Sequence, residues 1–145
     1  MWVIFEGLDK AGKTTLEWEF LKATNFKHMV IDRGPVGYMT FDKLFGRETK
    51  LGNQDFIHHS RKIMKNPDFM VVYCFTSEEV AAKRLNEHNE QCPYHYRSAQ
   101  KLLRDNVRRF YKPEKVLELD TGCRTISECV QMIIEKLEEV NKREL

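Results

Sequence analysis

The sequence predicts an α/β fold in which a small parallel sheet of about four strands is covered by helices on both faces. Short apolar runs that suit buried strands alternate with longer stretches of helical periodicity along the 145 residues. The resulting order, βαβαβαβα, is typical of parallel sheets whose strands are joined by helices. A glycine-rich stretch separates the first strand from the first helix, at an edge where such sheets bind ligands.

The individual elements follow from these patterns in chain order. The apolar runs predict strands at residues 2–5, 28–32, 69–75 and 115–120. Helical patterns occupy residues 14–24, residues 37–65 with a break near 46–53, residues 77–110 with a polar interruption near 86–93, and residues 127–140. Thr76 with Glu79 and Thr125 with Glu128 match the capping box, in which hydroxyl and carboxylate satisfy backbone N–H groups. Both boxes are therefore start signals for helices.

Length and composition favour one small domain over residues 1–145. The chain is 41% hydrophobic and 32% charged, which suffices for one hydrophobic core. Its length is too short for two domains. The 24 basic and 22 acidic residues give a net charge of +2, so the overall charge does not itself require nucleic acid. The sequence has no long apolar run, no segment typical of a signal peptide and no C-x-x-C cysteine pair. We therefore expect a cytoplasmic protein with reduced thiols and no membrane partner.

The glycine-rich stretch is the most specific chemical signal. Gly7, Gly12, Lys13 and Thr14 fall on the spacing G-x-x-x-x-G-K-[ST] of a phosphate-binding loop. Backbone N–H groups of such a loop form an anion nest, and the following helix adds the positive end of its dipole. We expect Lys13 to reach the outer phosphates of a nucleotide and the Thr14 hydroxyl to bind Mg²⁺. The expected cofactor-binding residues are Gly7, Asp9, Lys10, Ala11, Gly12, Lys13, Thr14 and Thr15.

A second signal follows the second predicted strand. Asp32 and Arg33 lie at its carboxyl end, which is the edge where open α/β sheets bind ligands. Asp32 could hold Mg²⁺ or accept a proton from an attacking hydroxyl, and Arg33 could stabilise charge on a transferred phosphoryl group. The structural alternative is a capping aspartate beside a solvated arginine. The adjacent phosphate loop favours the functional interpretation.

Four segments of the chain, two of which contain the glycine-rich loop and the Asp-Arg pair, resemble a known family. The relevant segments are FEGLDKAGKTT, VIDRG, NPDFMVVYCFTSEEVAAKRL and VLELDTGCRTISECVQMIIEKL. Together they resemble the thymidylate kinase group of P-loop deoxynucleotide and deoxynucleoside kinases, in a shortened form. The resemblance implies the three-layer P-loop NTPase (nucleotide kinase) fold, with ATP as phosphoryl donor and Mg²⁺ as cofactor. It further implies that Asp9 lies near the acceptor or the metal-bound water, that Lys10 stabilises the transferred phosphoryl group, and that Asp32 and Arg33 lie beside the acceptor.

The chain departs from these kinases between the first helix and the Asp-Arg pair. Only residues 24–28 separate the two, so the usual segment that reads the monophosphate is missing or displaced. An acceptor nucleotide would then be read after Arg33, where Tyr38 and Phe41 could stack on a base and Arg47 could bind its phosphate. The favoured alternative for the aromatic residues is that they form the core face of a helix at spacing 3 and 4, comprising Tyr38, Phe41, Leu44 and Phe45.

Residues 86–112 have the composition of a lid, and we call them the lid-like segment. Their basic residues repeat at helical spacing and share one face, comprising Arg97, Lys101, Arg104 and Arg108. This basic face could close over the phosphates of a nucleotide, with Arg97 as a candidate substrate ligand, or it could follow a nucleic-acid backbone. An ordinary solvated face is the alternative.

The polar start of the lid-like segment has further open interpretations. Tyr94 and Tyr96 could stack on bases or pack within the lid. His88, Cys92 and His95 could be three metal ligands, although no fourth ligand has a recognised spacing.

Three activities are therefore weighed. The first is a phosphotransferase that moves the γ-phosphoryl of ATP to a deoxynucleotide, with a thymidylate-type deoxynucleoside monophosphate favoured and Lys13, Asp32, Arg33 and Lys10 as catalytic residues. The second is a polynucleotide kinase acting on a DNA 5′-hydroxyl or a hydroxymethylated DNA base, because the acceptor side is open. The third, a nucleotide hydrolase or switch, ranks last because the chain has no N-K-x-D signature. A homodimer in which a second subunit completes the pocket is a further alternative.

Overall fold

The computed structural model describes residues 1–46, 58, 61–63 and 65–144 of the chain, and side chains up to residue 142. Strands and helices alternate along it in the predicted order. The elements are β1 (Trp2–Glu6), α1 (Lys13–Ala23), β2 (Met29–Asp32), α2 (Pro35–Leu44), β3 (Phe69–Phe75), α4 (Glu78–Glu87), α5 (Tyr96–Phe110), a 3₁₀ turn (Pro113–Lys115), β4 (Val116–Asp120) and α6 (Ile126–Glu144). The predicted α/β class and the four-stranded sheet are confirmed.

The four strands form one parallel sheet in the order β2-β1-β3-β4. Ile4 of β1 lies opposite Ile31 of β2 and Val71 of β3, and Val72 lies opposite Leu117 of β4. From β1 the chain first adds β2 on one side of this strand and then adds β3 on its other side, so the direction of winding reverses next to β1. In such sheets the carboxyl ends on either side of this reversal point open a crevice for ligands.

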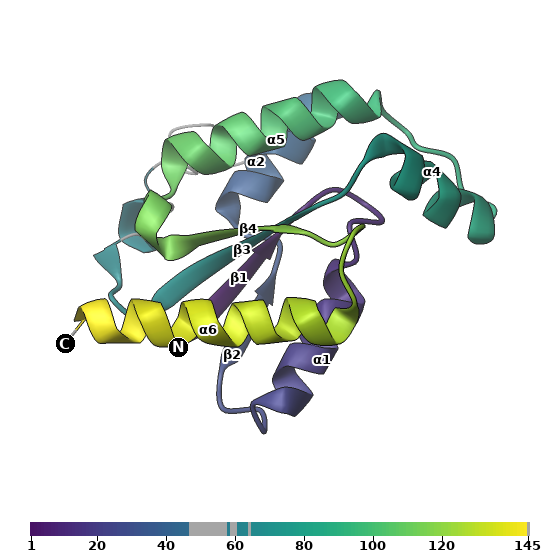
Figure 1. The fold of residues 1–145 in the computed structure, drawn as a ribbon. Coiled ribbons are helices and arrows are strands. Elements are labelled where there is room, and N and C mark those ends of the chain that lie inside the picture. The colour runs from purple at the N-terminus through teal and green to yellow at the C-terminus, as the bar shows by residue number, and fades with distance from the viewer. Residues whose placement is uncertain (47–57, 59–60, 64, 145) are drawn as a thin grey trace.

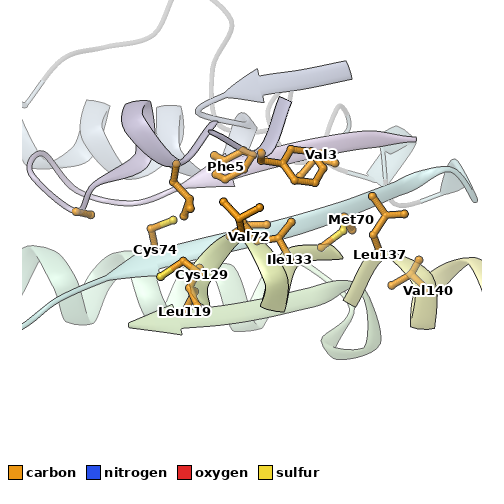
Figure 2. Packing of buried hydrophobic residues seen from close by; sticks show 14 residues of the cluster. Val3, Phe5, Met70, Val72, Cys74, Leu119, Cys129, Ile133, Leu137 and Val140 are labelled. Atoms are coloured by element: carbon orange, nitrogen blue, oxygen red, sulfur yellow. The ribbon is translucent and has the colours of Figure 1, made fainter. Parts of the chain in front are cut away.

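Helices cover both faces of the sheet, which makes the structure three layers deep. Helices α1 and α6 pack together on one face, and α2 and α5 pack together on the other (Figure 1). Alternate residues of β1 contact the two layers, because successive side chains of a strand point to opposite faces. Val3 and Phe5 lie in the core with α1 and α6, shown in Figure 2, whereas Ile4 lies in the core with α2 and α5.

The helix starts are only partly those expected from the capping boxes. At α6, Glu128 N–H donates to Thr125 Oγ1 at 3.1 Å and Thr125 N–H donates to Glu128 Oε1 at 3.3 Å, which confirms that box. The box expected at Thr76 is wrong. Helix α4 is capped by Ser77, whose hydroxyl oxygen accepts from Val80 N–H at 3.2 Å, while the Thr76 side chain is buried.

Of the two long helical regions expected from the sequence, residues 77–110 are divided as predicted. Residues 37–65 lie partly outside the described residues. The interruption expected at 86–93 is real, since α4 ends at Glu87 and α5 begins at Tyr96. Helix α2 ends at Leu44, and most of the remaining 46–65 region is outside the described part of the chain. None of the described helices is both long enough and apolar enough to cross a lipid bilayer.

Both ends of the chain lie at the amino ends of the strands. Met1 directly precedes β1, and its terminal nitrogen lies 3.4 Å from His28 Nδ1 near the start of β2. Helix α6 begins after the carboxyl end of β4 and runs back along the sheet, so the two termini lie on the same side in Figure 1.

Candidate nucleotide-binding site

A cleft of about 510 Å³ lies at the carboxyl ends of the strands, within the usual size range of ligand sites. The loop after β1 forms its floor, and residues after β2 and β4 form its sides. Its lining includes the predicted cofactor residues Asp9, Lys10, Ala11, Gly12, Lys13, Thr14 and Thr15, together with Asp32 and Arg33. The structure therefore brings both sequence signals into one cavity.

The loop after β1 has a backbone that few sequences can adopt. Gly12 has φ of 84° and Lys10 has φ of 63°, both in the left-handed region. A side chain at Gly7 would place its Cβ 2.7 Å from the carbonyl oxygen of Cys74 in β3, so the loop passes close against the neighbouring strand. These positions explain the glycine spacing, because the loop must bend tightly where β1 ends and α1 begins.

Lys13 and Asp32 meet across the cleft. Lys13 Nζ lies 3.4 Å from Asp32 Oδ1, and the lysine side chain is 11% exposed. Lys13 is the first residue of α1 and Asp32 the last residue of β2. The contact brings an ammonium group, a carboxylate and the amino end of a helix together. The ammonium group and the helix end can neutralise the charge of a phosphate, and the carboxylate can bind a divalent cation.

Arg84 and Thr121 hold the loop in place, and neither was expected from the sequence. Arg84 of α4 donates to the carbonyl oxygen of Lys10 at 2.7 Å and to the carbonyl oxygen of Thr121 at 3.1 Å. The Thr121 hydroxyl, just after β4, donates to the carbonyl oxygen of Ala11 at 2.6 Å. Both residues also line the cleft. No local spacing in the sequence indicates these contacts, because they join segments far apart in the chain.

A buried carboxylate supports the turn that carries Arg33. Glu6, at the end of β1, accepts hydrogen bonds from Gly34 N–H and Gly37 N–H, each at 2.7 Å. Complete burial raises the pKa of Glu6 to about 7, although these donors and the Tyr111 hydroxyl act in the opposite direction. Arg33 itself has φ of 64°, so this turn is strained at the residue expected to contact the acceptor.

Glu17 is a second acidic residue next to Asp32 that sequence reasoning missed. It lies on α1 and is 8% exposed. Burial, followed by the influence of Asp32, raises the pKa of Glu17 to about 8, while Lys13 opposes this shift. The sequence holds one signal for this position, since Glu17 follows Thr14 by three residues and residues at this spacing lie on the same face of a helix.

Aromatic rings of α2 pack against Arg33, which lines the cleft after β2. The guanidinium of Arg33 lies 4.0 Å from the ring centroid of Phe41 and 5.7 Å from that of Tyr38. The expectation that the helix aromatics form a core face holds for Phe41, which is buried. It is wrong for Tyr38 and Phe45, which are 50% and 41% exposed. Arg47, the other residue expected on this side, lies outside the described residues.

The lid-like segment contacts the phosphate loop through its first part. The Tyr94 hydroxyl accepts from Asp9 N–H at 3.2 Å, and its ring packs edge-on against Phe41 and Phe45. Lys10 Nζ lies 3.1 Å from Glu90 Oε1. Tyr94 therefore packs against two aromatic rings near the carboxyl end of α2, whereas Tyr96, the first residue of α5, is buried in the core between α5 and the sheet.

The predicted basic face of α5 turns out to be largely paired with carboxylates. Arg97 donates to Glu78 at 2.6 Å, Lys101 to Asp105 at 2.8 Å, and Arg108 to Glu118 at 2.7 Å. Arg97 does not line the 510 Å³ cleft and lies instead in a separate hollow between α4 and α5. The structure therefore does not bring Arg97 together with Lys13 and Asp32.

The possible metal ligands near the start of the lid-like segment do not gather. Within the described residues, no three His, Cys, Asp or Glu side chains come together as metal ligands. His95 instead caps α5, where its ring nitrogen accepts from Ser98 N–H at 3.3 Å.

Comparison with solved structures places this cleft in a known fold. The YorR protein from Bacillus subtilis, in complex with phosphorylated GDP, aligns with a TM-score of 0.77 at 18% identity, over 95% of this chain and 96% of that chain. Thymidylate kinase from Candida albicans aligns with a TM-score of 0.57 at 14% identity, over 99% of this chain and 93% of that chain. No protein-family model and no curated protein matches the sequence. The chain has the fold of a P-loop nucleotide kinase. Within that class its fold is thymidylate-kinase-like, as the resemblance in the sequence implied.

Proposed function

We propose that this protein is a phosphotransferase that moves the γ-phosphoryl group of ATP to a deoxynucleotide, with a thymidylate-type deoxynucleoside monophosphate as the favoured acceptor. The observation that carries the proposal is the meeting of Lys13 and Asp32, 3.4 Å apart, over the phosphate loop. The shared fold with thymidylate kinase and with a protein bound to phosphorylated GDP supports a nucleotide in this cleft.

The donor side follows from the loop and the helix behind it. Backbone N–H groups of residues 7–15 and the amino end of α1 would hold the phosphates, and Lys13 would leave Asp32 to bind the outer ones. The donor set fits Mg²⁺, since the Thr14 hydroxyl and the Asp32 carboxylate both line the cleft and offer the hard oxygen ligands that this ion prefers. A bound Mg²⁺ would supply positive charge to the phosphates during transfer.

The acceptor side is assigned to the turn after β2 and its aromatic surroundings. Arg33 would bind the acceptor phosphate, Asp9 and Asp32 would orient the acceptor, and the exposed ring of Tyr38 would contact its base. An acceptor phosphate oxygen forms the new bond to the γ-phosphorus as the bond from that phosphorus to the bridging oxygen breaks, which releases ADP. Lys10, held near Glu90, would stabilise the charge on the transferred group.

The lid-like segment is proposed to close this arrangement. Its contacts at Tyr94 and Glu90 reach the phosphate loop directly, which would exclude water from the transferred group. Water exclusion favours transfer over hydrolysis. The pairing of Arg97, Lys101 and Arg108 with carboxylates weakens the polynucleotide alternative, because paired cations neutralise fewer DNA phosphates.

The test is transfer of labelled γ-phosphate from ATP with Mg²⁺ to a panel of acceptors. The panel holds deoxynucleoside monophosphates, deoxynucleosides, 5′-hydroxyl oligonucleotides and hydroxymethylated DNA. We expect label in a monophosphate and at least a hundredfold loss in Lys13→Ala, with Lys22→Ala, exposed on the same helix and paired with Glu19, as the matched control. Label found only in a polymer would replace the acceptor assignment, and equal turnover without any acceptor would indicate a hydrolase.

A further inference from the structure

We propose that the hollow between α4 and α5 is a second binding site, which takes a phosphate group either as the free ion or as part of a small phosphate ester. The hollow measures about 270 Å³ and is lined by residues of α4, of α5 and of the end of β3. In the described part of the chain, it shares no lining residue with the cleft that holds the phosphate loop. The proposal therefore does not depend on the reaction assigned to that cleft.

Buried polar atoms without a partner gather at this hollow. Among the described residues, five buried polar side-chain atoms lack a hydrogen-bond partner, and four of the five belong to residues that line the hollow. These four atoms are Thr76 Oγ1, the Tyr96 hydroxyl oxygen, Gln100 Nε2 and Arg104 Nε. Thr76, Tyr96 and Gln100 are only 4%, 8% and 8% exposed. Because native proteins leave few buried polar atoms unsatisfied, this concentration indicates a partner that the chain itself does not supply.

The chemistry of the four atoms selects a ligand that is rich in hydrogen-bond acceptors. The Tyr73 hydroxyl donates to Gln100 Oε1, which leaves the Gln100 amino group as a pure donor. Arg104 Nε is also a pure donor, and its guanidinium lies over Phe75, 5.0 Å from the ring centroid. The two unpartnered hydroxyls can donate as well. A group with several acceptor oxygens is therefore the ligand that these atoms fit.

The charge around the hollow favours a negatively charged ligand. The first two residues of α4 and the first two residues of α5 all line it, so the amino ends of both helices lie there. The amino end of a helix carries partial positive charge and binds anions. The basic side chains of Arg97, Lys101 and Arg104 outnumber the two carboxylates, those of Glu78 and Glu79. A phosphate group combines negative charge with several acceptor oxygens.

One ion pair joins the two helices at the hollow. Arg97 Nε of α5 donates to Glu78 Oε2 of α4 at 2.6 Å. The two side chains are 75% and 44% exposed, and ion pairs so exposed contribute little to stability. An entering phosphate group can therefore replace Glu78 as the partner of Arg97, since guanidinium groups bind phosphate oxygens in pairs.

The competing explanation is that ordered water alone satisfies the four atoms in solution. Water would leave the hollow without affinity for any phosphate compound. A third explanation is that the basic side of α5 attracts all anions weakly, in which case chloride would act as phosphate does. The identity of the solute that binds decides among these explanations.

The experiment is a titration of the full chain, labelled with ¹⁵N and followed by NMR. The probes are inorganic phosphate, ribose 5-phosphate and ribose, with sodium chloride at matched ionic strength. The side-chain N–H signals of Gln100 and Arg104 report the hollow itself. They therefore distinguish it from phosphate binding at the loop between β1 and α1.

We expect phosphate compounds to shift both side-chain signals with saturation, and ribose and sodium chloride to leave them unchanged. Tighter binding of ribose 5-phosphate would assign the group to an organic ester, and saturation by inorganic phosphate alone would assign it to the free ion. Absence of a saturable shift, or equal shifts with ribose or sodium chloride, would overturn the proposal.

A matched pair of variants tests the charge of the hollow. Arg104→Gln removes a cation from the lining and should weaken phosphate binding about tenfold, measured at the Gln100 signal. Arg109→Gln makes the same change at an exposed position on the same helix, outside the hollow, and should match the wild type. Circular dichroism establishes that each variant is folded, and equal affinities in the two variants would contradict the site.

A second variant decides the matter if Arg104→Gln does not fold. The Thr76 hydroxyl has no partner in the described chain, so Thr76→Val should leave the melting temperature of the ligand-free protein unchanged or raise it. The same variant should weaken phosphate binding several-fold, because the ligand loses a donor. Folded Thr76→Val protein with wild-type phosphate affinity would overturn the proposal.

Discussion

Tyr111 and Glu6, 105 positions apart in the sequence, meet in a buried hydrogen bond in which the tyrosine hydroxyl donates to Glu6 Oε2 at 3.2 Å. The same carboxylate accepts from two backbone groups of the turn after Arg33. The end of β1, the end of α5 and the turn after β2 are thus joined at one ionisable residue.

This buried carboxylate predicts a specific pH dependence of stability. The pKa of Glu6 is raised from 4.5 to about 7 in the folded protein, so the folded state holds this proton to a higher pH than the unfolded chain does. The contribution of Glu6 is complete below pH 4.5 and is lost as pH rises towards 7, on the order of 3 kcal/mol in the free energy of unfolding. Urea denaturation across pH 4 to 8 would measure it.

The comparison that isolates Glu6 uses two variants. Glu6→Gln should lack this loss, so the difference in free energy of unfolding between it and the wild type should change across the same pH window. Tyr111→Phe keeps the carboxylate and removes one donor, so its pH dependence should persist and extend to higher pH. A difference that is constant with pH would contradict the role of Glu6.

Arg84 should matter for donor binding although it lies outside the phosphate loop motif. Arg84→Ala removes hydrogen bonds to the carbonyl oxygens of Lys10 and Thr121, so we expect the KM for ATP to rise about tenfold or more. Steady-state kinetics at varied ATP would measure this. Lys83→Ala, the exposed neighbour on α4, is the control, and equal KM values for the two variants would argue against a supporting role.

Tyr94 offers a way to separate the hydroxyl contact from ring packing. Tyr94→Phe loses the contact with Asp9 N–H but keeps the ring against Phe41 and Phe45, so nucleotide affinity should fall about fivefold with little change in the melting temperature. Tyr94→Ala should lower both. Nucleotide titration by calorimetry and a thermal melt decide the matter, and an unchanged affinity in both variants would remove Tyr94 from the site.

The capping box of α6 predicts a stability effect alone. Thr125→Ala loses the hydroxyl that accepts from Glu128 N–H, which should lower the free energy of unfolding by about 1 kcal/mol. Ser127→Ala, exposed in the first turn of the same helix, is the control. Both values come from urea denaturation at constant pH, where equal effects would mean that the box does not stabilise the helix.

The parts that sequence reasoning predicted are those set by local pattern. Strand β3 was expected at Phe69–Phe75 and lies there, because its apolar run is bounded by residues that favour turns. The tight loop between β1 and α1 lies where the glycine spacing predicts a loop, since Gly12 has a positive φ and Gly7 has no room for a Cβ. A local requirement of this kind is visible in one sequence.

The parts that were missed depend on tertiary contacts. Arg84 and Thr121 reach the loop from α4 and from the end of β4, so no spacing along the chain connects them with it. The capping box at Thr76 failed because this side chain is buried and the next residue, Ser77, supplies the cap. Tyr38 and Phe45 fit a core pattern along α2 but are exposed, because no other element of the described chain covers that part of the helix.

The position of both termini has a practical consequence for handling the protein. Because Met1 and the end of α6 lie at the amino ends of the strands, and the cleft lies at their carboxyl ends, both extremities lie at the opposite end of the sheet from the cleft (Figure 1). A fluorescent label, an affinity tag or a tether to a sensor chip can therefore be attached at either extremity without obstructing the mouth of the cleft. Surface-based measurements of ADP binding can thus use the intact chain in either orientation.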